Sequence, residues 1–159
     1  MTLPNPSNTL AVGFGMTINA VDNLFNDVFL GNGLEIGNGS GDVTNTIFMG
    51  NGGHVYTTTN GVVLGNGAET AVSTNVVNIG NGAHSHDGVN CVSIGNGAHA
   101  QSGQRLTAIG SAANSVEGQD IIAIGATAWA YGVNLNTFDI QITLSGVVGT
   151  FSVGDVITG

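Results

Sequence analysis

The chain has almost no basic residues. Arg105 is the single arginine or lysine against ten aspartates and glutamates, and the 159 residues carry a formal net charge of −9. Because phosphate groups and anionic lipid surfaces are bound by clusters of lysine and arginine, this balance speaks against a nucleic-acid partner and against an anionic membrane surface. The lone Cys91 excludes an intrachain disulfide, and two prolines exclude a collagen-like helix.

Long apolar runs are also missing. No stretch approaches the roughly 20 apolar residues of a membrane-spanning helix. The N-terminus has no basic segment followed by an apolar core, so we expect no secretory signal. Hydrophobic residues nevertheless make up 42% of the chain and charged residues only 7%, which excludes ordinary disorder and indicates one folded module.

What the chain does have is a strict repeat. An aliphatic residue followed by glycine recurs every 15 residues, at Met49-Gly50, Leu64-Gly65, Ile79-Gly80, Ile94-Gly95, Ile109-Gly110 and Ile124-Gly125. A fixed short period predicts a solenoid in which each repeat forms one coil. The Gly-Asn-Gly runs that follow are typical of tight corners, since both residue types tolerate left-handed backbone conformations. Each coil is expected to hold two short strands and two corners.

The residues before each glycine alternate as in a strand. We expect the β-branched columns to fill the coil interior: Val62, Leu64, Val77, Ile79, Val92, Ile94, Ile109, Ile122 and Ile124. The intervening columns are also largely small or apolar, and a strand that is apolar on both faces is covered on both. We therefore expect the intervening columns to contact further copies of the chain in a closed oligomer, through Val63, Val76, Cys91, Leu106 and Ile121.

The flanks break the repeat. Residues 1–45 keep related pieces with altered spacing and are expected to form an irregular N-terminal attachment and capping segment, with the repeats confined to 46–132. In residues 133–159 apolar and polar residues alternate around turn sequences, which predicts a small antiparallel β unit. Whether it continues in a longer chain is left open by the sequence.

Three units carry a resemblance to a known family. Val92-Ser93-Ile94-Gly95, Thr107-Ala108-Ile109-Gly110 and Ile122-Ala123-Ile124-Gly125, each followed by a small-x-small run, resemble the head repeat of YadA-like trimeric autotransporter adhesins. The resemblance covers about residues 46–132. It implies an all-β, left-handed parallel β-roll, a solenoid of about 15-residue coils whose three copies pack into a homotrimer. Such rolls also occur in phage fibres and other virion proteins.

Candidate chemical sites are few. His84 and His99 occupy the same repeat position and would lie one rung apart, about 4.8 Å, so they are the candidates for a metal site. We expect an exposed variable column there instead, with no metal, cofactor or catalytic residue. Trp129 and Tyr131 are expected to cap the end of the roll, with a sugar or protein contact as the alternative.

Together these observations predict a non-enzymatic, homotrimeric structural protein of a bacteriophage virion, assembled in the host cytoplasm. The preferred role is a tail-fibre segment that docks on other virion proteins and supports adhesion to a host receptor. A trimeric capsid decoration protein and a fragment of a bacterial YadA-like surface adhesin remain the alternatives. The host, the receptor and the docking partner are beyond the sequence.

Overall fold

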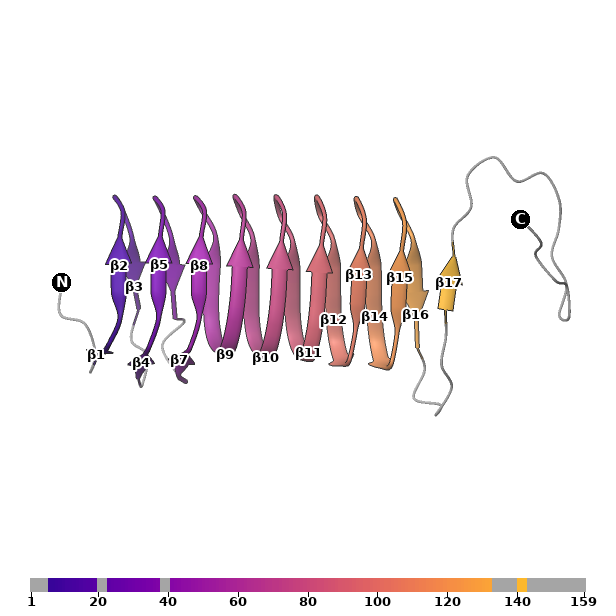
Figure 1. Ribbon diagram of the computed structural model, residues 1–159, viewed down its shortest axis with the longest axis horizontal. Coiled ribbons are helices and arrows are strands. Elements are labelled where there is room, and N and C mark those ends of the chain that lie inside the picture. The colour runs from indigo at the N-terminus through magenta and orange to yellow at the C-terminus, as the bar shows by residue number, and fades with distance from the viewer. Residues whose placement is uncertain (1–5, 20–22, 38–40, 133–139, 143–159) are drawn as a thin grey trace, which may run out of the picture.

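A computed structural model describes residues 6–19, 23–37, 41–132 and 140–142 of the chain. These residues form an all-β structure without helices, in which parallel strands stack as a β-solenoid of about eight turns (Figure 1). The predicted fold class is therefore confirmed at the level of the chain. No helix in the described part of the chain is long and apolar enough to cross a membrane.

The strands follow one another without other secondary structure. Their bounds are β1 (Pro6–Ser7), β2 (Leu10–Val12), β3 (Thr17–Ile18), β4 (Leu24–Phe25), β5 (Val28–Leu30), β6 (Glu35–Ile36), β7 (Val43–Thr44), β8 (Ile47–Met49), β9 (His54–Leu64), β10 (Glu69–Ile79), β11 (His84–Ile94), β12 (His99–Gln104), β13 (Thr107–Ile109), β14 (Asn114–Gln119), β15 (Ile122–Ile124), β16 (Trp129–Tyr131) and β17 (Ile140–Ile142).

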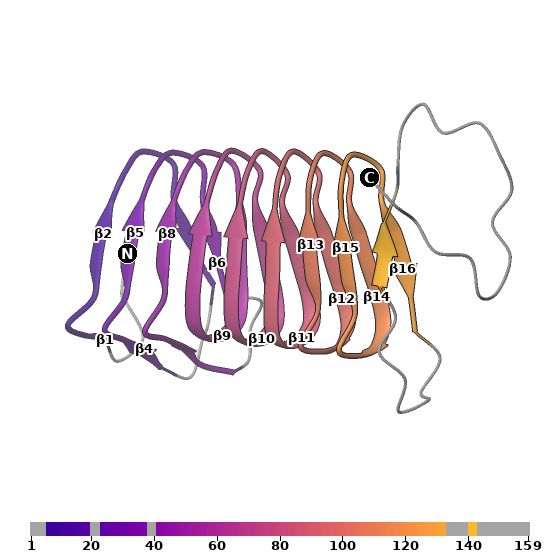
Figure 2. The ribbon, with the colours of Figure 1, turned by 45° about the vertical axis from the view of Figure 1, so that its right-hand side comes forward.

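Each coil crosses the molecule twice, which produces two facing sheets. The first sheet consists of β2, β5, β8, β13 and β15 together with the second halves of β9, β10 and β11. The second sheet consists of β3, β6, β12, β14 and β16 together with the first halves of β9, β10 and β11 (Figure 2). All pairings are parallel, and Ile79 lies opposite Ile94 while Glu69 lies opposite His84. The 15-residue period of the sequence is thus the register of the sheets.

The space between the two sheets is narrow. The second sheet lines it with a column of fully buried alanines: Ala68, Ala83, Ala98, Ala113 and Ala128. The first sheet opposes them with Ser93, Ala108 and Ala123 in the later coils. The largest buried side chains, Phe29 and Phe48, lie in the early coils, where coils 18 or 19 residues apart occur beside those of 15. In the later coils a larger buried side chain shares its rung with a small one, as Leu106 does with Ala108 and Ile121 with Ala123.

A buried polar cluster lies in the middle coils. Asn78 is fully buried, donates from Nδ2 to the Glu69 carbonyl at 2.8 Å and accepts from Ser85 Oγ at 2.6 Å. Ser93 Oγ donates to the His84 carbonyl at 2.9 Å. Because each of these polar groups has a partner inside the coil, their burial carries little of the penalty of an unsatisfied group.

The glycine of each repeat lies where neighbouring coils approach most closely. Gly80 has φ +139°, and a Cβ built on it would lie 2.2 Å from the carbonyl oxygen of Gly95 in the next coil. Gly82, two residues later, has φ +64° but no atom within 4 Å of the position of its Cβ. The repeat glycine is thus required by steric contact, whereas the second position is only left-handed and holds Ala112 and Thr127, with φ 54° and 56°, in the later coils.

Two expectations about the flanks are wrong for the described residues. Residues 6–19, 23–37 and 41–45 do not form a separate cap: β2 pairs with β5 and β5 with β8, in the same parallel stack. The longer spacing between equivalent residues of the early coils is due to longer corners, and the strands themselves stay in register. At the other end β17 pairs parallel with β15, where an antiparallel unit was expected, and the remainder of 133–159 lies outside the described residues.

This corner geometry gives a direct test. We expect Gly80→Ala to lower the free energy of unfolding by roughly 3 kcal/mol or more, because the methyl group would overlap the Gly95 carbonyl in a strained backbone region. Gly82→Asn should change it by less than about 1 kcal/mol, since asparagine tolerates the left-handed region and meets no neighbour there. Denaturant unfolding of both variants measures the difference, and equal stabilities would contradict the account.

Candidate functional site: an aliphatic face

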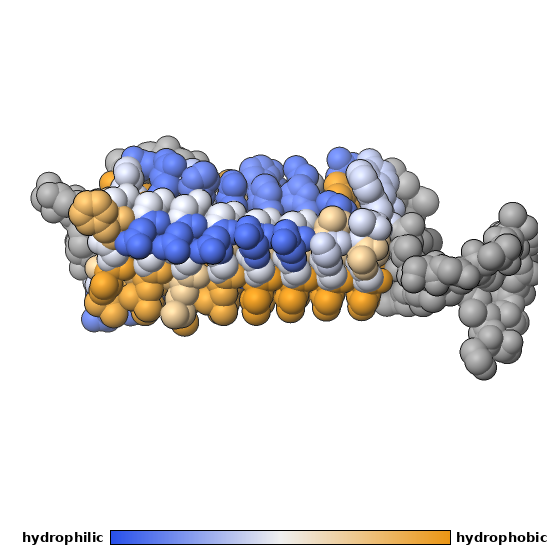
Figure 3. All heavy atoms as spheres, turned by 90° about the horizontal axis from the view of Figure 1, so that it is seen from above, coloured by the Kyte–Doolittle hydropathy of each residue, from blue (hydrophilic) through white to orange (hydrophobic). Residues whose placement is uncertain are grey.

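The outer surface of the first sheet is almost entirely aliphatic. Its outward side chains form two columns over the whole stack: Leu10, Val28, Ile47, Val62, Val77, Val92, Thr107 and Ile122 in one, and Val12, Leu30, Met49, Leu64, Ile79, Ile94, Ile109 and Ile124 in the other. Thr107 is the one polar member. We call these 16 side chains the aliphatic face, and Figure 3 shows it as a continuous band along the solenoid.

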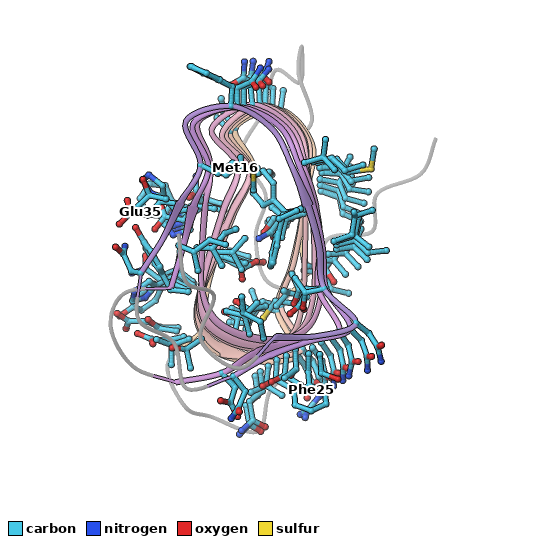
Figure 4. All side chains as sticks on the ribbon, turned by 90° about the vertical axis from the view of Figure 1, so that its left-hand side faces the viewer. Met16, Phe25 and Glu35 are labelled. Carbon is cyan, nitrogen blue, oxygen red and sulfur yellow. The ribbon has the colours of Figure 1, made fainter. Side chains whose placement is uncertain are left out.

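Members of the aliphatic face are open to solvent in the single chain. Leu10, Val12 and Ile124 each expose more than half of their surface, at 53%, 55% and 53%, and Met49 exposes 45%. Members of the inner coils are partly covered by their neighbours on the rungs above and below. Viewed along the solenoid axis, the aliphatic rows point away from the interior, on the side opposite to Glu35 (Figure 4).

The predicted sides of the first sheet are exchanged. The columns expected in the interior, from Val62 to Ile124, form the outer aliphatic face. The columns expected at the trimer contact are buried inside the coil instead, with Val63, Val76, Cys91, Leu106 and Ile121 at most 1% exposed. The reason is steric: a 15-residue coil is too thin to hold two large aliphatic side chains per rung, so the column with alanine, serine and glycine turns inward.

The aliphatic face is large for an uncovered surface. At about 4.8 Å per rung, eight rungs span about 34 Å, and two columns of side chains are about 12 Å wide, which gives a footprint on the order of 400 Å². Soluble monomers seldom expose a contiguous apolar patch beyond a few hundred Å². At about 25 cal/mol per Å², covering this face would contribute on the order of 10 kcal/mol before the cost of association.

Two ladders of asparagine border the aliphatic face, one at each corner. At the corner that precedes it, amide groups are linked from Asn8 through Asn26, Asn45, Asn60 and Asn75 to Asn90, each Nδ2 donating to the next Oδ1 at 2.8 to 3.1 Å. At the following corner the side chains of Asn32, Asn51 and Asn66 accept from the backbone amides of the preceding coil at 2.9 to 3.2 Å. An apolar centre with a polar rim is the usual anatomy of a protein interface.

The outer surface of the second sheet has a different character. Glu35, His54, Glu69, His84 and His99 occupy one outward column on successive rungs. His54 lies 3.7 Å from a carboxylate oxygen of Glu35 and 3.7 Å from one of Glu69, and His84 Nε2 lies 3.9 Å from the other oxygen of Glu69. This surface is polar and titratable, so the two sheets offer a partner opposite chemistry.

The structure brings the two metal candidates together, as the repeat predicted. His84 and His99 are in register, and their rings stack with centroids 4.6 Å apart. Partial burial, followed by the neighbouring His99, lowers the pKa of His84, while Glu69 acts in the opposite direction. Within the described ranges no group of three histidine, cysteine or carboxylate residues is placed to hold a metal ion.

Asp27 is a buried carboxylate that sequence reasoning missed. It lies in the interior column that later coils fill with Val76, Cys91 and Leu106, and it accepts a hydrogen bond from the Thr46 backbone amide at 2.8 Å. Desolvation raises its pKa to about 6, against which the backbone hydrogen bonds act. Asp27 belongs to a coil longer than 15 residues, so an alignment of the sequence at the 15-residue period does not place it in this column.

Comparisons with protein-family models, with curated proteins and with solved structures gave no match. The resemblance to YadA-like head repeats therefore stays a prediction from the motif.

The buried Asp27 makes a prediction about pH. Because its folded pKa exceeds the value of 3.8 for a free carboxyl group, stability is lost as the pH rises from about 4 through 6. We expect the wild-type protein to lose roughly 2 to 3 kcal/mol relative to Asp27→Asn between pH 4 and pH 7. The substitution itself also changes the free energy of unfolding, by an amount that does not depend on pH, so the two variants are compared by the slopes of their pH profiles. The matched variant Asp42→Asn, at an exposed position, should leave the profile unchanged, and parallel profiles for Asp27→Asn would contradict the assignment.

Proposed function

We propose that three copies of this chain pack through their aliphatic faces into a homotrimeric rod, and that the rod is a structural, non-enzymatic component of a bacteriophage particle, most specifically a tail-fibre segment. The observation that carries the assembly is the aliphatic face itself. It runs the length of the solenoid and has no charged member. A second copy of the same surface matches it in both length and chemistry.

Self-association also fits the arrangement of the other surfaces. A closed ring of three copies places the aliphatic faces at its axis, with the asparagine ladders at the seams and the histidine and glutamate column outside. The face carries no titratable group, and its only heteroatoms are the hydroxyl of Thr107 and the thioether sulfur of Met49, so it suits packing rather than catalysis. The three-fold count and the virion setting come from the YadA-like resemblance.

The proposed trimer is tested by introducing an aspartate on the outer surface of either the first or the second sheet. We expect the wild-type protein to have three times the chain mass of 15.9 kDa by light scattering. Val92→Asp buries a carboxylate in the apolar centre of the contact and should shift the protein to monomers, because an unpaired buried charge costs several kcal/mol.

The matched control is Val116→Asp, which introduces the same charge on the outward side of β14 in the second sheet. It should remain trimeric. A monomeric wild-type protein, or equal dissociation of both variants, would contradict the proposed contact.

The virion setting has its own test. Antibodies raised against the chain and imaged on intact phage particles should label thin projections of the tail. Label on the capsid shell would favour the decoration protein instead, and label on a bacterial surface without particles would favour the adhesin fragment.

A further inference from the structure

A polar hollow lies in the surface at the corner where β12 and β14 end. Its side chains come from two neighbouring rungs, with Ser102 and Gln104 on one and Glu117 and Gln119 on the next. All four side chains are exposed, and Gln104 lies in register with Gln119. The lining thus offers a hydroxyl, two amides and a carboxylate on one short stretch of surface.

The floor of the hollow is backbone. Gly103 is in register with Gly118, and Gly132 continues the column on the last coil, where its amide donates to the carbonyls of Val116 and Glu117 at 3.1 and 3.0 Å. All three glycines line the hollow. A Cβ in this column would meet the next coil or the buried Ile121 rather than enter the hollow, so glycine is present because the coils pack closely there.

One aromatic ring, that of Tyr131, contacts the wall of this hollow. Figure 2 shows β16 at the end of the solenoid, and Trp129 and Tyr131 on this strand remain 59% and 50% exposed. The expectation that they cap the coil is therefore wrong for these side chains. Tyr131 Oη donates to Glu117 Oε2, which ties its ring to the wall of the hollow.

The charges near the hollow favour a neutral ligand. No basic side chain lines it, and Glu117 would repel an anion. Arg105 Nη2 donates to Oε1 of the lining residue Gln119 at 3.5 Å, but the same guanidinium donates to both carboxylate oxygens of Asp120, which balances its charge. A flat aromatic ring next to amide and carboxylate groups matches a sugar, whose ring has an apolar face and a rim of hydroxyl groups.

We propose that this hollow, with Tyr131 at its edge, binds a neutral carbohydrate. Gln104, Gln119 and Glu117 hydrogen-bond the hydroxyl groups, and the ring of Tyr131 stacks on the apolar face of the sugar. None of the residues that line the hollow belongs to the aliphatic face. The inference names a ligand class for host adhesion and rests on the proposed function for that role.

Titration calorimetry tests the binding directly. The protein is titrated with lactose, cellotriose, maltotriose and tri-N-acetylchitotriose, with sialyllactose as the anionic comparison. We expect a saturable change with at least one neutral sugar and a weaker one, or none, with the charged sugar. The absence of a saturable response to all four neutral sugars, or a preference for sialyllactose, would overturn the proposal.

Variants tie the binding to this hollow. Calorimetric affinities should fall about tenfold or more for Gln119→Ala and for Tyr131→Ala, since each removes a direct contact. Tyr56→Ala is the matched control, because Tyr56 holds the same outward repeat position as Tyr131 on a distant coil. Wild-type affinity in both test variants, or equal loss in the control, would overturn the site.

Light scattering on the same samples separates the two proposals. A trimer that binds no neutral sugar contradicts the inference alone. A monomer that binds one through Gln119 and Tyr131 contradicts the proposed assembly and leaves the site in place.

Discussion

The structure depends on how little space a 15-residue coil encloses. Between the two sheets, opposite the buried alanine column from Ala68 to Ala128, a rung holds one larger side chain beside a small one, as Leu106 with Ala108 and Ile121 with Ala123 show. The other aliphatic side chains of the first sheet point outward. The same constraint explains the early coils, where 18- and 19-residue spacing coincides with the buried rings of Phe29 and Phe48.

This constraint moves the hydrophobic surface from the inside of the chain to its outside. A globular domain buries its aliphatic residues within one chain, whereas the described part of this solenoid displays them in two straight columns on its surface. Asparagine ladders link successive rungs at the corners on either side of these columns. In the proposed trimer the columns are covered at the contact between copies.

Much of this arrangement could be predicted from the sequence. The 15-residue period gives the parallel register directly, because Ile79 and Ile94 are in equivalent positions of neighbouring coils. The alternation of Val92, Ser93 and Ile94 shows that two columns lie on opposite sides, but alternation alone does not say which side is inside. Here the general preference for burying β-branched residues pointed the wrong way, and the small size of Ala108 and Ala123 was the better guide. The coils that begin at Leu10 and Val28 could not be predicted from the 15-residue period, because their corners are longer. The hollow beside Gly118 could not be predicted either, because its lining residues come from three different rungs.

The central claim is that the aliphatic face is covered by other copies of the chain while the second sheet stays open. It is tested most directly by the reactivity of single cysteines, introduced as Ile94→Cys or His99→Cys in a Cys91→Ala background and measured by the rate of alkylation of the native protein. The account predicts strong protection of the thiol at position 94, lost on dilution to monomers, and rapid alkylation at position 99. Equally rapid alkylation of both thiols at high protein concentration would contradict it.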